Sequence, residues 1–437
     1  MEGFSLRVAF YTLGCKVNQY ETAALKEQFS HRGYEVVESG GEADLYVVNS
    51  CTVTAEGDKK SRQALRRFRR QSPLAKIALT GCFPQAFPEE AQIIPEADIV
   101  VGSSNRSALV ELAEQAFLTG ERIVSILPHA PGTPFEPLSA GEFTGRTRAL
   151  LKIQDGCRRF CSYCIIPTAR GPLRSMPPAQ MREQLAQLAA SGYREVVLAG
   201  INLPCYGVEL GLTLLDAVTL ACETPGLDRV RLGSLEPELL TPEAMEAMSR
   251  LESLCPQFHL SLQSGCDATL ARMRRQYDTA EYRRIVEQLR RSFPGCAITT
   301  DIMVGFPGET DAEFEQTLAF AREIQLAQAH IFTYSRREGT AAASYPGQVP
   351  QSVKNHRSHL LSEVTNASAS AFLQAQVGTI QPVLFENPHT PGRQPGHTPN
   401  YTLVTVPHGE TLARRILPVH ITAVEGQGCM GELVSPP

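Results

Sequence analysis

The chain has 437 residues, of which 43% are hydrophobic and 20% charged, and its formal net charge is -5 at pH 7. This length predicts two or three hydrophobic cores, since single domains usually contain about 100–200 residues, and the charge argues against a surface that is basic throughout. Twelve cysteines are too few for a disulfide scaffold, and because no apolar run approaches the length of a membrane span, we expect a cytoplasmic protein without a membrane partner.

Residues 1–120 alternate between strand-like and helix-like segments, which predicts an open, parallel α/β domain. Short apolar runs indicate strands at 7–13, 44–49, 76–80 and 99–101. Helical patterns occupy 21–32, 58–71 and 107–118. In a sheet of this kind the carboxyl ends of the strands lie along one edge.

Three cysteines of this first domain each follow one of its predicted strands: Cys15, Cys51 and Cys82. Their separations correspond to about one strand–helix–strand unit. Because adjacent parallel strands end at the same crevice, we expect the three thiols to converge there as a three-thiolate site. The alternative is that they are small buried residues without a ligand.

Residues 121–147 are expected to link the first domain to the next, because proline, glycine, serine and threonine are frequent there. An ordered surface loop wrapped on the following domain would have the same composition. The sequence leaves these two interpretations open.

Residues 148–372 predict a partial barrel of six β/α units. Strand-like runs lie at 149–154, 195–199, 229–233, 258–262, 297–304 and 329–334, and each gap between them contains a helical pattern. Thr241 and Pro242 mark one helix start, as an N-cap hydroxyl followed by proline at the first helical position. Six units are too few for a closed eight-stranded barrel but sufficient for an open one.

Three further cysteines, Cys157, Cys161 and Cys164, follow the first strand of this barrel with the spacing C-x-x-x-C-x-x-C. A structural zinc site would need four ligands. Three thiolates on a four-iron cluster leave one iron open to a substrate or cofactor, which suits catalysis. The alternative, three structural cysteines close together by chance, does not account for this spacing.

Polar or small residues also follow the other strands of the partial barrel. In parallel β/α architectures this rim carries the active site. The candidates for cofactor binding, apart from the cysteines, are Tyr163, Gly200, Asn202, Ser234, Glu236 and Gln263.

Residues 375–437 contain short strand-like runs at 378–385, 401–406, 417–424 and 431–434, separated by Pro/Gly turns. This pattern predicts a small antiparallel β-barrel. The segment resembles the TRAM domain, an RNA-binding module of RNA-modifying enzymes, most clearly in residues 396–401, with the sequence GHTPNY. A barrel that stabilises the protein without contacting RNA is the alternative.

The cysteine motif, with Tyr163 before its last cysteine, resembles the radical S-adenosylmethionine (SAM) enzymes. Over all three domains the chain is similar to the methylthiotransferases of that superfamily. Four stretches most resemble the branch that methylthiolates carbon 2 of threonylcarbamoyladenosine beside the anticodon of tRNA: TLGCKVNQYET (12–22), NSCTVT (49–54), DIMVGFPGET (301–310) and FTYSRREGT (332–340).

This resemblance implies two [4Fe–4S] clusters and SAM as cofactors. Cys157, Cys161 and Cys164 would hold the radical-generating cluster, and the three N-terminal cysteines an auxiliary cluster that carries the inserted sulfur. Tyr163 would lie against the adenine of SAM. The substrate would bind between the clusters, and the partners would be tRNA, an electron donor such as flavodoxin or ferredoxin, and a sulfur source.

A tRNA partner requires positive surface, and the predicted helix after Cys51 is rich in arginine. We expect phosphate contacts from Arg62, Arg66, Arg67 and Arg70, with a solvated helix face as the alternative. A second group, Arg272, Arg274 and Arg275, could act on SAM or on the threonyl carboxylate of the substrate.

Some residues depart from the family pattern, namely Thr168, Met176 and the stretch 203–205. They affect the expected contacts with substrate and leave the six cysteines unchanged. Two related functions remain as alternatives, methylthiolation of isopentenyladenosine in tRNA and of an aspartate in a ribosomal protein. A noncatalytic iron–sulfur protein that binds RNA is the alternative from another class.

Overall fold

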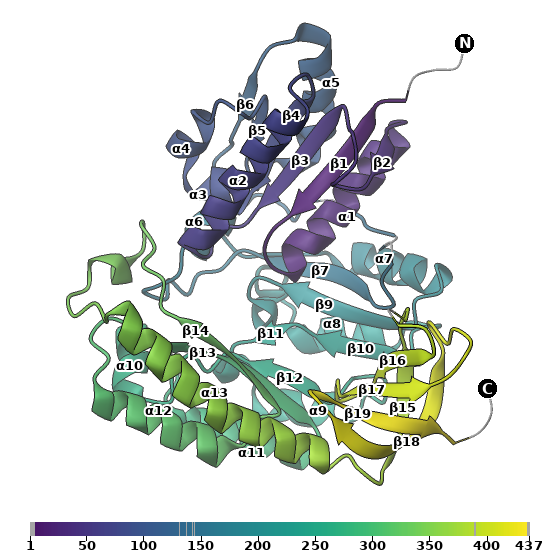
Figure 1. Cartoon of the computed structure of the whole chain (residues 1–437), viewed down its shortest axis with the longest axis vertical. Helices are drawn as coiled ribbons and strands as arrows, with labels where there is room; N and C mark the ends of the chain where they lie inside the picture. Colours follow the sequence, from purple (N-terminus) through teal and green to yellow (C-terminus); the bar gives the residue numbers. More distant parts are fainter. Residues whose placement is uncertain are drawn as a thin grey trace.

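In the computed structural model, the described residues are 5–130, 132–136, 138–141, 143, 145–388 and 390–434. Four positions of the expected linker, and the outer ends of the first and last expected domains, lie outside these ranges. The chain forms an N-terminal α/β unit, a larger central α/β unit and a C-terminal barrel, shown from purple through green to yellow in Figure 1.

The N-terminal unit is a six-stranded sheet in the order β2-β1-β3-β4-β5-β6, in which every pairing is parallel. Its strands are β1 (Arg7–Thr12), β2 (Glu35–Val37), β3 (Leu45–Ser50), β4 (Lys76–Gly81), β5 (Ile99–Val101) and β6 (Ile123–Ser125). Its helices are α1 (Lys16–His31), α2 (Ala55–Gln71), α3 (Cys82–Ala86), α4 (Pro88–Gln92) and α5 (Leu109–Thr119).

Helices cover both faces of this sheet because successive strand residues point to opposite sides. Tyr46 and Val48 of β3 pack in one core with α2, α3 and α4, whereas Leu45 and Val47 pack in another with α1 and α5. The open parallel α/β fold expected for this unit is confirmed. The short strand β6 extends the sheet into the segment expected to be a linker, because Ile123 pairs with Ile99 of β5.

The central unit consists of eight strands in two four-stranded sheets, β10-β9-β7-β8 and β11-β12-β13-β14. The strands are β7 (Ala149–Asp155), β8 (Arg174–Ser175), β9 (Glu195–Gly200), β10 (Arg229–Leu232), β11 (Ser234–Leu235), β12 (Gln257–Leu260), β13 (Ala297–Val304) and β14 (Gln328–Thr333). The helices are α6 (Ile166–Arg170), α7 (Pro178–Ala190), α8 (Leu214–Cys222), α9 (Pro242–Met248), α10 (Asp267–Arg272), α11 (Thr279–Ser292), α12 (Asp311–Ile324) and α13 (Gln351–Gln374).

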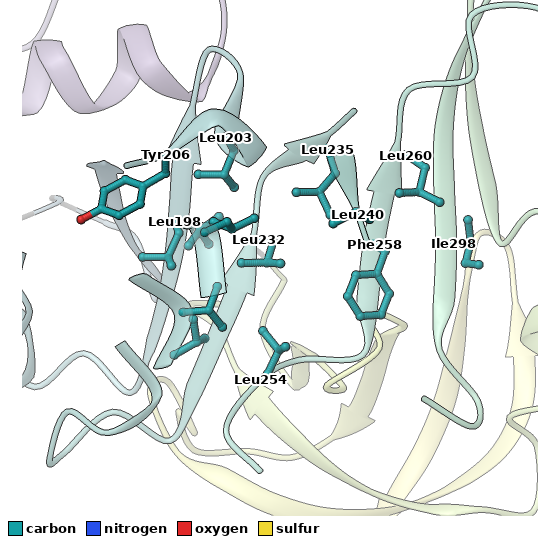
Figure 2. Close-up of a cluster of buried hydrophobic side chains, with 14 of the residues drawn as sticks. Leu198, Leu203, Tyr206, Leu232, Leu235, Leu240, Leu254, Phe258, Leu260 and Ile298 are labelled. Atoms are coloured by element: carbon teal, nitrogen blue, oxygen red, sulfur yellow. The ribbon is translucent and has the colours of Figure 1, made fainter. Parts of the chain in front are cut away.

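The six expected strands of the partial barrel are present, and they form a curved arc rather than one continuous sheet. β10 pairs with β9, and after Gly233 the chain continues as β11, which pairs with β12. Gly233 lies close to the neighbouring strand, because a Cβ there would be 3.1 Å from the carbonyl oxygen of Leu198. Leucine and phenylalanine side chains from β9, β10, β11 and β12, with Tyr206 from the loop after β9, form a continuous core across this division (Figure 2).

The C-terminal unit is a closed five-stranded barrel in the order β15-β16-β17-β19-β18. Its strands are β15 (Ile380–Phe385), β16 (Arg393–His397), β17 (Leu403–Pro407), β18 (Ile416–Glu425) and β19 (Gly428–Leu433). The expected barrel is confirmed, but one of its pairings, β17 with β19, is parallel. β16 was not expected, because Pro395 and Gly396 within it are residues typical of turns.

The segment between the first two units packs closely on the central one. Phe135, Leu138, Ala140 and Phe143 are buried in the core of the central unit. Tyr20 of α1 donates a hydrogen bond to the carbonyl oxygen of Leu138 at 2.7 Å. In its described part this segment is an ordered loop, which was the second of the two interpretations.

The described residues contain no single helix that is long and apolar enough to cross a bilayer. One sharply bent pair, Leu203–Leu210 with Leu214–Cys222, meets the requirement by length and composition alone.

Candidate active site

The loop after β7 carries the three clustered cysteines, and its backbone is held in place at both ends. Gly156 has φ 79°, and a Cβ on it would lie 1.8 Å from the carbonyl oxygen of Pro172, so only glycine fits. The N–H of Cys157 donates to the carbonyl oxygen of Gly171 at 3.1 Å. The N–H of Cys164 donates to the carbonyl oxygen of Cys161 at 2.9 Å, which closes a backbone turn between the last two cysteines.

Two polar side chains reach the sulfur atoms of this loop. Arg275 Nη1 lies 3.3 Å from the Sγ of Cys161, and the same guanidinium forms an ion pair with Glu236. Asn202 Nδ2 lies 3.8 Å from the Sγ of Cys157. The Oδ1 of Asn202 is buried and has no hydrogen-bond partner among the described residues. An acceptor left free in this position suits a polar ligand beside the cysteines.

The other rim candidates differ in their surroundings. Gly200 lies close to β7, because a Cβ there would be 3.0 Å from the Cβ of Gln154. Ser234 is exposed at the start of β11. Gln263 has φ 65°, and its N–H donates to the carbonyl oxygen of Asp301 at 2.8 Å. Tyr163 is partly buried against the apolar cluster that contains Met273. The structure thus brings these residues to the rim, and their contacts with a cofactor stay predictions.

The three N-terminal cysteines follow adjacent strands that are paired in register. β1, β3 and β4 are neighbours, with Thr12 beside Asn49 and Ser50 beside Gly81. Cys15 precedes α1, Cys51 follows β3, and Cys82 is the first residue of α3.

Two of these cysteines are preceded by glycines with positive φ that pack tightly against neighbouring residues. Gly14 has φ 106°, and a Cβ on it would lie 3.2 Å from the Sγ of Cys51. Gly81, which precedes Cys82, has φ 101°. A side chain at Gly14 would fill the space beside the Cys51 sulfur. The segment that carries Cys15 therefore lies against Cys51 at this edge of the sheet, and the three-thiolate site stays a prediction.

Buried cysteines of both sets have raised pKa values. Burial raises the pKa of Cys82 to about 12, and the charges of Cys51 and Cys15 also raise it. Burial likewise raises the pKa of Cys164 to about 12. Thiols with such pKa values are neutral at pH 7 unless a metal replaces their protons.

All twelve cysteines are free of disulfides. In the ranges that the structure describes, no three His, Cys, Asp or Glu side chains are arranged around a single metal ion. A four-iron cluster is larger than one ion and holds its thiolates further apart. Three thiolates at each site suit a four-iron cluster with one open iron better than a structural zinc ion, which takes four protein ligands.

A buried group of charged residues joins the N-terminal and central units, and no sequence pattern indicated it. Glu21 of α1 is fully buried and forms ion pairs with Arg106, Lys152 and Arg170. Burial raises the pKa of Glu21, but these three cations outweigh that effect and lower it to about 2. Glu21 is therefore ionised, and it ties the N-terminal unit to β7 and α6 of the central unit.

The arginines of α2 are only partly available for phosphate. Arg62 forms an ion pair with Glu90, and Arg66 Nε lies 3.4 Å from an oxygen of Glu96. The guanidinium of Arg67 lies over the ring of Tyr11. Arg70 is exposed and forms no salt bridge within the described part of the chain. Of the four residues expected to bind RNA, Arg62 and Arg66 are thus already paired.

The three arginines near the loop after β12, Arg272, Arg274 and Arg275, lie in different surroundings. Arg272 forms an ion pair with Glu313, and Arg275 is bound to Glu236 beside Cys161. Arg274 has φ 59°, an uncommon conformation for a residue with a side chain. Both Nη atoms of Arg272 are bound to Glu313 and those of Arg275 to Glu236, so within the described residues neither guanidinium offers two free Nη donors to a substrate carboxylate.

The stretch with the strongest TRAM resemblance lies at the base of the central unit. Arg229 donates to the carbonyl oxygen of His397 at 2.9 Å, and Arg231 donates to that of Pro399 at 3.0 Å. Asn400 donates to the carbonyl oxygen of Gly295 at 3.1 Å. These bonds attach the C-terminal barrel to the strand ends opposite the cysteine rim.

Comparisons with known proteins agree with this geometry. Residues 151–321 match the Radical SAM superfamily, and residues 7–102 match the uncharacterized protein family UPF0004. The threonylcarbamoyladenosine tRNA methylthiotransferase MtaB of Bacillus subtilis is 39% identical over 422 residues, which are 95% of this chain and 93% of that one. The chain belongs to the radical SAM methylthiotransferases.

Two other relatives also match most of this chain. MtaB of Thermotoga maritima is 40% identical over 87% of this chain and 86% of its own. The tRNA-2-methylthio-N(6)-dimethylallyladenosine synthase of Symbiobacterium thermophilum is 34% identical over 99% of this chain and 95% of its own. This methylthiotransferase therefore resembles, over nearly its whole length, enzymes named for two different modified adenosines.

Solved structures support the fold alone. The radical SAM methyltransferase TsrM from Kitasatospora setae, with cobalamin and a [4Fe–4S] cluster bound, has a TM-score of 0.54 at 16% identity and covers 76% of this chain and 72% of its own. Radical SAM enzymes use a [4Fe–4S] cluster and SAM, and the methylthiotransferases carry a second cluster. The cofactors expected from the sequence are those of the family.

Proposed function

We propose that this enzyme methylthiolates carbon 2 of threonylcarbamoyladenosine in tRNA. The observation that carries the proposal is the pair of three-cysteine sets, one in each of two α/β units that the buried Glu21 holds together. The relatives named MtaB supply the substrate, and the chain matches them over most of its length. The reaction would take place in the cytoplasm, with an electron donor such as flavodoxin or ferredoxin and a source of sulfur.

In this proposal Cys157, Cys161 and Cys164 hold one cluster, and Cys15, Cys51 and Cys82 hold the other. The clusters, when bound, supply one-electron reduction of SAM at the first site and storage of sulfur at the second. Three protein thiolates at each site leave one iron position open.

The chain's own residues bind and orient the cofactor beside the first site. The free Oδ1 of Asn202 would accept a hydrogen bond from SAM, and Tyr163, in its apolar cluster, would provide a flat surface for the adenine. Glu236 acts indirectly, since its carboxylate is paired with Arg275, whose Nη1 lies 3.3 Å from the Sγ of Cys161. Gly200, Ser234 and Gln263 complete the proposed cofactor site at the ends of β9, β10 and β12.

A loop from the end of β14 brings the central unit close to the second site. Arg337 lies 2.5 Å from an oxygen of Asp58 and donates to Thr52, the residue after Cys51. Its guanidinium also lies over the ring of Phe87. A target adenosine held between the units would be adjacent to both cysteine sets and shielded from water by this contact.

The experiment is an anaerobic assay of the reconstituted enzyme with SAM and a reductant, followed by mass spectrometry of tRNA nucleosides. tRNA with threonylcarbamoyladenosine should yield the methylthio product, and tRNA with isopentenyladenosine should not. Product only on isopentenyladenosine, or only on a ribosomal protein, would replace the proposed substrate. Binding of tRNA without any cleavage of SAM would favour the noncatalytic alternative.

A further inference from the structure

Arg170 is the last residue of α6, the short helix after the loop with Cys157, Cys161 and Cys164, yet its side chain reaches the cysteines of the other unit. Its Nε lies 3.2 Å from the Sγ of Cys82 and donates to it. Arg170 is completely buried and Cys82 is 2% exposed. A cation from the central unit therefore forms part of the surroundings of a sulfur atom in the N-terminal unit.

A second donor of Arg170 extends this contact toward the other two cysteines. Its Nη2 donates to the Oδ1 of Asn18 at 2.7 Å. The Nδ2 of Asn18 donates to the carbonyl oxygens of Leu13, at 2.9 Å, and Ser50, at 3.0 Å. Leu13 lies two residues before Cys15, and Ser50 immediately precedes Cys51. One guanidinium thus connects to all three strand ends that carry the cysteines.

Two buried carboxylates set the orientation of this guanidinium. Glu21 Oε2 accepts from Nη2 at 3.1 Å, and Asp155 Oδ2 lies 3.5 Å from Nη1. Glu21 belongs to the N-terminal unit and Asp155 to the end of β7. The two carboxylates and Asn18 hold both Nη atoms of Arg170. In this orientation the Nε–H points at the Sγ of Cys82.

We propose that Arg170 is a positioning residue that orients Cys82 and raises the reduction potential of the auxiliary cluster. The inference rests on the proposed function only in taking Cys15, Cys51 and Cys82 as ligands of a cluster. A hydrogen-bond donor and positive charge beside a ligating sulfur stabilise the more negative, reduced cluster. Because Arg170 comes from the central unit, the auxiliary site is complete only when the two units are docked.

The test uses the full chain with Cys157, Cys161 and Cys164 replaced by Ala, so that only the auxiliary cluster remains. The midpoint potential is measured by redox titration followed by electron paramagnetic resonance, before and after Arg170→Met. We expect a lower midpoint in Arg170→Met with the iron content retained. Arg170→Lys keeps the charge but cannot place a donor on Cys82 while bound to Glu21 and Asp155, so its shift should be in the same direction and smaller.

Arg106→Met is the matched control. Arg106 is also completely buried and lies 2.8 Å from Glu21, but its other ion pair is with Glu136 and not with a cysteine site. A purely structural role for Arg170 predicts similar losses of stability in both variants and an unchanged potential. A downward shift in Arg170→Met that is absent from Arg106→Met supports the proposal.

An unchanged midpoint in Arg170→Met, with the cluster intact, overturns the inference and leaves the proposed function standing. If Arg170→Met does not fold, Arg170→Lys decides in the same way, because an unchanged midpoint in it also overturns the inference. The absence of any auxiliary cluster in the parent variant would overturn both, since it contradicts the role of the cysteines themselves.

Discussion

The guanidinium carbon of Arg231 lies 4.5 Å from the centre of the Tyr401 ring, and this contact joins the base of β10 to the C-terminal barrel. Arg148 lies 5.0 Å from the same ring centre, and the ring of His397 stacks on Tyr401 with centres 4.4 Å apart. The GHTPNY stretch is therefore engaged within the protein. Its position agrees with the stabilising role that the sequence left open as an alternative to RNA binding.

We expect Tyr401→Ala to lower the free energy of unfolding by about 1–3 kcal/mol, because it removes two cation–π contacts and a stacked ring. Its affinity for tRNA should change little. Denaturant unfolding and a tRNA binding assay measure the two effects. His420→Ala, at an exposed position of β18, is the control and should alter neither. Unchanged stability together with weaker tRNA binding would contradict this prediction and favour a role of the GHTPNY stretch in binding RNA.

Glu386 makes the same junction sensitive to acid. Burial raises its pKa, but hydrogen bonds and charges from His397 and Arg148 outweigh burial and lower it from 4.5 to about 2. A carboxyl with a depressed pKa stabilises the fold above its unfolded pKa and loses this contribution as the pH falls through the folded value. The contribution should therefore be complete above about pH 4.5 and disappear toward about pH 2.

Glu386→Gln should consequently cost up to about 3 kcal/mol of unfolding free energy at pH 7 and flatten the dependence of stability on pH in that acid window. Unfolding measured as a function of pH tests this. Glu432→Gln, an exposed substitution on β19, provides the comparison. Parallel pH profiles for Glu386→Gln and the wild type would contradict the assignment.

Arg70 is the α2 arginine best placed for a phosphate, because it is exposed and free of salt bridges in the described residues. We expect Arg70→Ala to weaken tRNA binding and to flatten its salt dependence by up to about 0.9 log units per log unit of salt for a lost phosphate contact. Arg66→Ala, whose guanidinium is already paired with Glu96, should have a smaller effect. Equal effects of the two substitutions would show that the ion pair does not matter for binding.

Replacing Cys157, Cys161 and Cys164 with Ala should reduce the bound iron from about eight to about four atoms per chain and abolish SAM cleavage. The reason is that these three residues are the proposed protein ligands of the cluster that reduces SAM. Iron analysis and chromatography of 5′-deoxyadenosine measure the result. Cys222→Ala on α8, away from both sites, is the control. Formation of 5′-deoxyadenosine by the triple variant would contradict the radical assignment.

Cys82→Ala should eliminate the methylthio product while leaving some SAM cleavage, since SAM would bind at the other cysteine set. Cys15→Ala and Cys51→Ala should behave alike. The ratio of 5′-deoxyadenosine to methylthiolated nucleoside, determined by mass spectrometry, separates the two activities. Normal product formation by any of the three would refute a sulfur-carrying role for this site.

The sequence by itself was sufficient for the features that depend on neighbouring residues. The motif around Cys157 lies within one loop, and Cys15, Cys51 and Cys82 each follow a strand whose apolar residues identify it. Because the carboxyl ends of parallel strands meet at one edge, convergence was expected from topology without any knowledge of side-chain contacts. The sequence did not predict β16, because Pro395 and Gly396 are typical of turns. In the barrel both residues pair with β17 as strand residues.

Only the tertiary structure decided which charged residues are free and which are already bound. Arg170 and Cys82 are 88 residues apart in sequence, and no local pattern connects them. The pairing of Arg62 with Glu90, and the burial of Glu21 among three cations, likewise depend on how helices pack. A charged residue without a nearby partner in the sequence is normally expected at the surface. Only the packing of the chain shows the partner that makes its burial favourable.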